Sequence, residues 1–250
     1  MASSKDAAGT LGHRPMIVPR IEAPVPRVPE DVLAVFRAAY LPDISDAVGP
    51  LYTMDPAIRP LYQPMRRLVG QALTVKAPPG DNLTVHGAML LVHPGDVVVI
   101  DWRGYVGACG SGATSLLEPI ALGLIGVVID GAWRDVGQLQ TLDFPVFGKA
   151  INALSPPKER PGEINVAIAC GGVVVEPGDI VVADEEGVVV VSLRWAQQVA
   201  SSLHPHNQGK SVTDFTDAEL QAKRAHRLRY FTGKLDEYGG RMPTLLDADG

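Results

Sequence analysis

The chain has 250 residues, 46% of them hydrophobic, and a formal net charge of −6 at pH 7; this composition supports a substantial core and argues against wholesale disorder. An acidic balance without a basic tail gives little electrostatic support for nucleic-acid binding, and two cysteines are too few for a disulfide framework. The N-terminus has no apolar stretch of signal-peptide type, and the longest apolar run, 120–129, is shorter than the roughly 20 residues of a membrane span, so we expect a soluble cytoplasmic protein with no nucleic-acid or membrane partner.

Residues 1–28 are expected to form an extended or disordered arm, because prolines interrupt RPMIVPRIEAPVPRVPE (14–30) throughout. A first helix is expected to begin near Pro29, since proline suits a first helical turn and Glu30 and Asp31 suit the positive end of the helix dipole. Residues 29–250 are expected to form a single domain that includes a C-terminal helical tail.

Alternation of apolar and polar residues predicts a strand in 70–80 that stops at Pro78, and continuous apolar, β-branched runs predict strands at 95–101 and 126–130. Gly and Pro turns divide 165–191 into several short predicted strands. Helical segments are expected at about 113–123, 135–142, 193–203 and 216–231. Pro119 either kinks the first of these helices or marks its true first turn. Because strands and helices alternate without long linkers, the pattern predicts one α/β domain with a mixed sheet.

Two segments share the frame xPGDxVVxDxxG, namely HPGDVVVIDWRG (93–104) and EPGDIVVADEEG (176–187). Each predicts a turn, a strand, and an aspartate where the strand ends. They are either two similar turn-strand units or two pseudo-equivalent strands of one core.

An adjacent Arg134–Asp135 pair stands just past the predicted strand at 126–130. In open α/β sheets, ligands bind beyond the carboxyl ends of strands. The planar fork of arginine matches a carboxylate, and an aspartate can hold a divalent cation that bridges to the ligand. The pair therefore indicates either a site for a small anionic, metal-chelating molecule such as a 2-oxo acid, or a surface ion pair with Asp135 as a helix N-cap.

The stretch GYVGACGSGATSLLEPIALGL (104–124) indicates a glycine-rich loop that enters a helix and exposes backbone N–H groups to an anion. Ser111, Thr114 and Ser115 are expected to cap this helix or to contact a ligand. Cys109 has no clear base partner, so a nucleophilic role is not expected. Asn82 and His86 share one helical face, and His86 either faces the site or packs beside it.

Taken together, these segments resemble the RraA-like family, which includes 4-hydroxy-4-methyl-2-oxoglutarate aldolase and 4-carboxy-4-hydroxy-2-oxoadipate aldolase. The resemblance covers roughly 30–245. The segments that carry it are ISDAVG (44–49), GQALTVKAPPGDNLTVHGAM (70–89), HPGDVVVID (93–101), GLIGVVIDGAWRD (123–135), FPVFGK (144–149) and GGVVVEPGDIVVADEEGVVVV (171–191).

The resemblance implies a compact, layered α/β/β/α core of the swivelling-domain-like type, assembled as a homotrimer or homohexamer. It implies a metal-dependent (class II) lyase that cleaves a 4-hydroxy-2-oxo acid by a retro-aldol reaction, or decarboxylates oxaloacetate, to give pyruvate. By position, Arg134 would bind the carboxylate or keto oxygen of the substrate, and Asp135 would hold Mg²⁺ or Mn²⁺. The backbone N–H groups of Gly112, Ala113, Thr114 and Ser115 would bind the pyruvyl carboxylate.

The chain departs from the aldolases at Ala113, where they carry an Asp or Glu that helps to order the water around the metal. Restoring the acid as Ala113→Asp is therefore expected to tighten Mg²⁺ binding. Asp101 is a candidate to compensate within the chain, and Glu219 is a candidate acid supplied across a subunit interface. Two other functions remain open: a catalytically silent regulatory or binding protein, like the family members that regulate ribonuclease E, and an enzyme with an altered reaction at the same Arg–Asp site.

Overall fold

The computed structural model describes residues 19–203 and 215–240, which belong to two compact units divided between His204 and Pro205. Residues 1–18 of the expected N-terminal arm, and 204–214 and 241–250 of the expected single domain, lie outside the described residues. The assignment of 29–250 to one domain therefore stays a prediction.

The first unit is built on a nine-stranded sheet whose main path runs β1-β5-β4-β3-β2-β10-β11. The strands β2 to β5 pair in parallel along this path, whereas β1, β10 and β11 pair antiparallel with their neighbours. The strands of the path are β1 (Arg59–Pro60), β2 (Leu68–Lys76), β3 (Asp96–Cys109), β4 (Gly126–Trp133), β5 (Val146–Gly148), β10 (Ile180–Asp184) and β11 (Gly187–Val191). Two short strands lie off the path: β6 (Ala150–Ile151) on β4 and β7 (Glu163–Ile164) on β2. A separate hairpin consists of β8 (Ile168–Cys170) and β9 (Val173–Val175).

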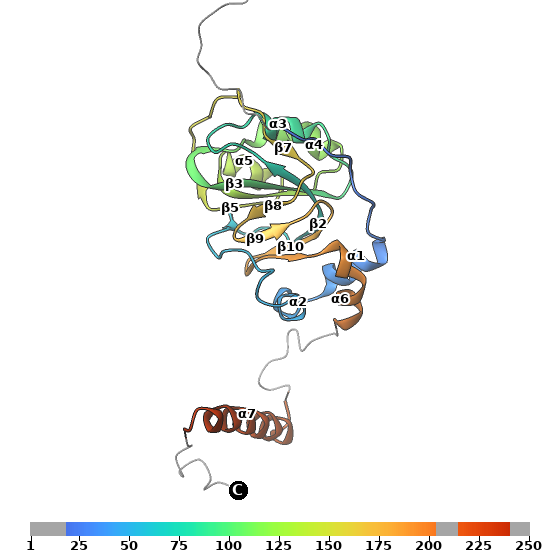
Figure 1. Cartoon of the computed structure of the whole chain (residues 1–250), viewed down its shortest axis with the longest axis vertical. Helices are drawn as coiled ribbons and strands as arrows, with labels where there is room; N and C mark the ends of the chain where they lie inside the picture. The colour runs from blue at the N-terminus through green and yellow to red at the C-terminus, as the bar shows by residue number, and fades with distance from the viewer. Residues whose placement is uncertain (1–18, 204–214, 241–250) are drawn as a thin grey trace, which may run out of the picture. The chain divides into compact units, whose positions relative to one another are not determined.

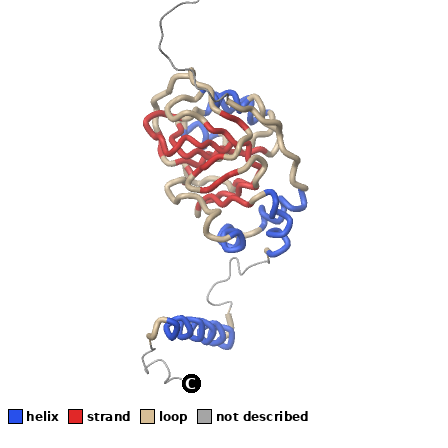
Figure 2. Tube along the Cα trace, viewed as in Figure 1, coloured by secondary structure: helices blue, strands red, loops and turns tan. Residues whose placement is uncertain are grey.

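The two edges of this sheet come close to each other. Thr53 forms an antiparallel bridge with Val189, and the N–H of Met54 donates to the carbonyl of Val188 at 2.9 Å. Since this segment leads into β1, it brings one edge strand beside β11 at the other edge. The sheet is therefore a nearly closed, barrel-like structure (Figure 2).

Helices cover the sheet in two groups, with the strands between them (Figure 1). One group packs over β3 and β4 and consists of α3 (Leu83–Met89), the 3₁₀ helix η1 (Ala113–Leu116), α4 (Leu117–Ala121) and α5 (Val136–Thr141). The other packs over β10 and β11 and consists of α1 (Glu30–Ala38), α2 (Leu41–Val48), the 3₁₀ helix η2 (Leu193–Trp195) and α6 (Ala196–Ser202). This arrangement confirms the expected α/β/β/α layers.

The strand sequences are continuously apolar because both faces of the sheet are covered. In β3, Ile100 and Trp102 belong to the apolar cluster under α3 to α5, whereas Val97 and Val99 belong to the cluster that the β8–β9 hairpin closes. Each fully buried aliphatic side chain of this kind stabilises the fold by about 1.5–3 kcal/mol.

The predicted strands at 70–80, 95–101 and 126–130 are confirmed, but the glycine-rich stretch differs from its prediction. Residues 104–109 continue β3 instead of forming a loop, because Tyr105 pairs with Gly131 and Cys109 with Ala132 on β4. Pro119 is the third residue of α4, so it lies in a first turn and does not kink a longer helix. The helix α2 was not predicted.

The two segments that share the PGD frame begin strands on either side of Gln71 in β2. The N–H of Gln71 donates to the carbonyl of Gly95 at 3.2 Å, and its Nε2 donates to that of Gly178 at 3.1 Å. Both glycines have positive φ angles, 84° and 83°. The two units are therefore strands of one core with the same turn, although β3 runs parallel to β2 and β10 antiparallel.

Residues 19–28 are extended and lie against the body of the first unit, where Glu22 donates its N–H to the carbonyl of Ile164 at 3.1 Å. The second unit contains α7 (Asp217–Glu237), which is longer than the predicted 216–231 and begins with a capping box between Thr216 and Glu219. Among the described residues, no helix has the length and apolar character needed to cross a membrane.

Candidate functional site

A pocket of about 230 Å³ lies where β3 and β4 end. It brings together five of the residues that the sequence singled out as a ligand site, Gly112, Thr114, Ser115, Arg134 and Asp135. The other residues of its lining are Asn82, His86, Cys109, Ser111, Ser155 and Lys158.

Asp135 has an unusual backbone conformation that turns its side chain away from its own helix. Its φ of 61° lies in the left-handed region, which aspartate tolerates better than most residues. It occupies the N-cap position of α5 but makes no side-chain cap hydrogen bond there. Instead, its Oδ2 accepts the N–H of Ala113 at 3.1 Å, so the carboxylate is held against η1.

Gly112 allows this close approach between η1 and the Arg–Asp pair. A Cβ at this position would lie 2.1 Å from Asp135 Oδ2 and 3.0 Å from Arg134 Nε. Any larger residue would therefore displace the carboxylate, and the glycine is needed for the geometry of the pocket.

Arg134 donates hydrogen bonds to two neighbouring carbonyl groups, but its Nε donor has no hydrogen-bond partner among the described residues. Its N–H donates to the carbonyl of Ser111 at 3.3 Å and its Nη1 to that of Ala153 at 3.3 Å. Its Nε lies 3.7 Å from Asp135 Oδ2, is buried, and makes no hydrogen bond within the described residues. An unpaired buried donor is costly for the fold alone, and a ligand in this pocket would supply its acceptor.

The short segment from Ser111 to Ser115 is braced by its own side chains. The hydroxyl of Ser115 donates to the carbonyl of Gly112 at 2.7 Å and also hydrogen-bonds the hydroxyl of Ser111. Ala113 is fully buried in the apolar cluster under α3 to α5 and is not part of the pocket lining. Its N–H already serves Asp135, so Thr114 and Ser115 are better placed than Ala113 to offer N–H groups to a ligand.

Asn82 and His86, which the sequence placed on one helical face, both line the pocket from α3. Asn82 is 2% exposed and donates from Nδ2 to the carbonyl of Gly110 at 2.9 Å, while its Oδ1 has no hydrogen-bond partner among the described residues. Burial of His86, and then the charge of Lys158, hold the pKa of its imidazole below the ordinary range. This shift favours the neutral form of the His86 imidazole.

Lys158 and Ser155 were not identified from the sequence. They lie in the proline-rich segment 152–162, which has no regular secondary structure and is remote in sequence from the Arg–Asp pair. Lys158 adds a second cation to the pocket beside Arg134, so the site favours an anion with two charged ends. The pKa of Cys109 is raised by burial, which disfavours the reactive thiolate and agrees with its expected lack of a nucleophilic role.

The two remaining candidates are Asp101 in the first unit and Glu219 in the second. Asp101 does not line the pocket; it follows the same side of β3 as Val97 and Val99, and its Oδ1 accepts the N–H of Arg103 at 3.1 Å. Glu219 belongs to the second unit, where its carboxylate accepts the N–H of Thr216 at 2.8 Å in the capping box of α7. The placement of Asp101 does not support a role beside Arg134, and a role of Glu219 at an interface stays a prediction.

The pocket could hold a metal ion through one carboxylate, but its described residues do not include the several protein ligands that would enclose an ion. Within the described part of the chain, no three His, Cys, Asp or Glu side chains gather closely enough to enclose a metal ion. Among the described residues, Asp135 is the sole carboxylate in the lining of the pocket. Mg²⁺ is commonly held by one or two carboxylates with water and substrate oxygens completing its shell, and the pocket fits a cation held in that way.

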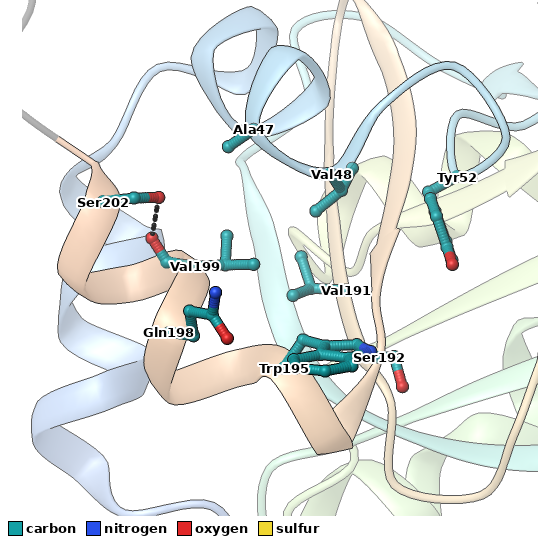
Figure 3. A pocket seen from close by; sticks show the side chains of 9 residues that line it. All are labelled: Ala47, Val48, Tyr52, Val191, Ser192, Trp195, Gln198, Val199 and Ser202. Carbon is teal, nitrogen blue, oxygen red and sulfur yellow. Dashed lines mark hydrogen bonds between the residues drawn. The ribbon is translucent and has the colours of Figure 1, made fainter.

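A larger pocket, of about 440 Å³, lies between α2, η2, α6 and the end of β11 (Figure 3). Trp195, Val199 and Val48 point into it, and Ser202 donates to the carbonyl of Val199 at 2.8 Å. Among the described residues, no charged side chain is part of its lining. These residues therefore offer no cation to a small anion, and the Arg134–Asp135 pocket is the stronger candidate.

Comparisons with known proteins agree with this architecture. The family model described as RraA-like, Aldolase/RraA, matches residues 41–190. A relative from Halalkalibacterium halodurans, named "Putative 4-hydroxy-4-methyl-2-oxoglutarate aldolase", is 40% identical over 161 residues, which cover 64% of this chain and 76% of the relative. A relative with the same name from Deinococcus radiodurans is 30% identical over 60% of this chain and 92% of its own length.

A solved structure shows the same fold. The crystal structure of RraAS2 from Streptomyces coelicolor, described as an unusual member of the RNase ES inhibitor RraA protein family, has a TM-score of 0.64 and 24% sequence identity, and the match covers 72% of this chain and 93% of that protein. On the family model and the identity to curated relatives, the chain belongs to the RraA-like family.

Proposed function

We propose that this protein is a divalent-metal-dependent lyase that cleaves a 4-hydroxy-2-oxo acid by a retro-aldol reaction, or decarboxylates oxaloacetate, to release pyruvate. The observation that carries the proposal is the buried Nε of Arg134, which has no hydrogen-bond partner among the described residues and lies beside the carboxylate of Asp135 in a pocket that also contains Lys158. The names of the relatives from H. halodurans and D. radiodurans support the same class of reaction.

The charges of the pocket define how such a substrate would bind. The 2-oxo carboxylate or keto oxygen would accept from Arg134, whose guanidinium suits planar oxygen acceptors, and from the N–H groups of Thr114 and Ser115. Lys158 would meet the distal carboxylate. The Oδ1 of Asn82, which has no hydrogen-bond partner among the described residues, would accept a hydrogen bond from a hydroxyl group of the substrate.

The reaction breaks the C3–C4 bond and leaves its electron pair on the pyruvate enolate. A Mg²⁺ or Mn²⁺ held by Asp135 would act as a Lewis acid toward the 2-oxo acid. Arg134 would stabilise the negative charge that develops on the former keto oxygen. His86, neutral because its pKa is lowered, would accept the proton of the 4-hydroxyl as the new carbonyl forms, and the proton returns to C3 to give pyruvate.

Ala113 favours a second candidate function, that of a catalytically silent family member which binds a small anion or a protein partner. The acid that orders metal-bound water in the aldolases is absent here, and the described residues put no other carboxylate into the pocket. An altered reaction at the same Arg–Asp site is the third possibility. We further propose that the chain assembles as a homotrimer or homohexamer, as the family resemblance implies.

The test is pyruvate release from oxaloacetate and from a panel of 4-hydroxy-2-oxo acids, with Mg²⁺, with Mn²⁺ and with EDTA. The lyase is expected to act on at least one substrate in a metal-dependent way. Arg134→Met should remove the activity with little change in melting temperature, because the side chain is 38% exposed and its contacts are few. No release from any substrate, together with intact binding of 2-oxo acids, would favour the silent binding protein.

A further inference from the structure

The segment 152–162 joins β6 to β7 and brings Lys158 to the pocket without any regular secondary structure of its own. A free segment of this length would let the lysine occupy many positions. Its fixed position therefore needs anchors, and the two residues just before α3 provide them.

Asp81 is the principal anchor. Its side chain is 0% exposed, and its Oδ2 accepts the N–H of Glu159 at 3.0 Å and that of Arg160 at 2.9 Å. Its Oδ1 accepts the N–H of Leu83 at 3.1 Å in α3. One buried carboxylate thus joins the start of the helix to the two residues that follow Lys158.

Asn82 holds the other side of the lysine. Its N–H donates to the carbonyl of Pro157 at 3.2 Å, while its side-chain Nδ2 donates to the carbonyl of Gly110 at 2.9 Å, just past the end of β3. Lys158 therefore stands between two anchored residues, both of which are tied to the dipeptide Asp81–Asn82.

The carboxylate of Asp81 suits this task because it is charged. Burial alone would raise its pKa, but the N–H donors of Leu83, Glu159 and Arg160 and the nearby guanidinium outweigh burial and hold the pKa below the ordinary range. Arg160 Nε lies 3.7 Å away, and the arginine side chain is 65% exposed, so the backbone donors supply the larger share of the contact.

We infer that Asp81 is a positioning residue, which fixes the 152–162 segment so that the Lys158 ammonium faces the substrate pocket. The inference rests on the proposed function only for the identity of the ligand. Asp81 acts through Lys158 and does not line the pocket itself. An asparagine at position 81 would turn an NH₂ group toward backbone N–H donors, and so would release the segment.

The first measurement requires no activity. Burial, and after it the charge of Lys158, lower the pKa of His86, so the NMR titration of His86 is sensitive to whether the segment and its ammonium are in place. Arg134, Asp135 and Cys109 are the other charged or titratable groups in the described lining of the pocket. Asp81→Asn should raise the pKa of His86 to the value found in Lys158→Met. A His86 titration in Asp81→Asn that matches the unsubstituted protein overturns the inference.

The second measurement is a double-mutant cycle with 2-oxoglutarate as a dicarboxylate probe and pyruvate as a monocarboxylate probe, followed by calorimetry. Asp81→Asn and Lys158→Met should each weaken 2-oxoglutarate binding by about tenfold, with no further loss in the double variant, because both remove the same charge-assisted contact. Pyruvate binding should change much less. Equal and additive losses for both probes would mean that Asp81 is only a structural residue.

Two controls separate the anchor from general stability. In the first control, Thr84→Val removes the hydroxyl that accepts the N–H of Gly162 at 2.6 Å, a hydrogen bond that joins the same segment to α3 four residues beyond Lys158. In the second, Arg160→Met removes only the exposed ion pair between Arg160 and Asp81. Both should leave the His86 titration unchanged. Asp81→Ser replaces Asp81→Asn if the latter does not fold. If neither probe binds the unsubstituted protein, the proposed function fails, while the His86 titration still decides the role of Asp81.

Discussion

The carboxylate Oδ2 of Asp135 lies 3.1 Å from the backbone nitrogen of Ala113, so the aspartate is held by the first residue of η1. The contact joins the end of β4 to the start of η1 across 22 positions of sequence. It fixes the direction of the Asp135 side chain before any ligand binds, which is the preorganisation that electrostatic catalysis requires.

Gly112→Ala is expected to abolish substrate binding and activity. The new Cβ would lie 2.1 Å from Asp135 Oδ2, a distance that forces the carboxylate to move, and a misplacement of about 1 Å in a site can cost 10²-fold in rate. The measurement is kcat/KM beside the melting temperature. Gly137→Ala in α5 is the matched control, because no atom lies within 4 Å of its added Cβ. Full activity in Gly112→Ala would show that activity does not require the observed positions of Arg134 and Asp135.

Asp135→Asn and Asp135→Ala are expected to separate charge from backbone strain. Both remove the carboxylate, so both should abolish metal-dependent activity. Asparagine tolerates the left-handed φ of 61°, whereas alanine adds a steric cost of roughly 1–2 kcal/mol. Chemical denaturation should therefore find Asp135→Ala the less stable of the two. Equal stabilities would indicate that the backbone relaxes at this position when the side chain is changed.

The strands and the position of Arg134 and Asp135 could be predicted from the sequence because both depend on local patterns, whereas the α/β/β/α layers were implied only by the family resemblance. Alternation marked β2, continuous β-branched runs marked β3 and β4, and the position of Arg134 and Asp135 followed from the end of one strand. The extension of β3 to Cys109 was missed, since glycines usually indicate a loop and only the pairing with Gly131 and Ala132 makes them a strand. Lys158 was missed because its place depends on buried hydrogen bonds to Asp81 and Asn82, which no local pattern shows.

The acidic limb of the pH–rate profile is expected to report His86. A base must be neutral to act, and burial together with Lys158 lowers the pKa of His86, so kcat/KM should persist below the ordinary histidine pKa of about 6.5 and fall at lower pH. Lys158→Met removes one cause of the lowering and should move this limb to higher pH. His86→Gln should remove the limb altogether. If the acidic limb of kcat/KM has the same pKa in both variants, a group other than His86 causes it.

Ala113→Asp is expected to lower the melting temperature in EDTA and to recover it with Mg²⁺. Ala113 is fully buried within an apolar cluster, and its backbone nitrogen is in contact with the carboxylate of Asp135. An added acid would thus meet both a desolvation cost and a like charge, and each is relieved only if a cation is shared between the two carboxylates. A restored outer carboxylate should also tighten Mg²⁺ binding, by about 10–100-fold if it acts as such groups do elsewhere. Thermal unfolding of both proteins against Mg²⁺ concentration measures the two effects, with Ala113→Asn as the neutral control. A destabilisation that Mg²⁺ leaves unchanged would show that position 113 faces the core and not a metal, and the proposed metal site would then depend on Asp135 alone.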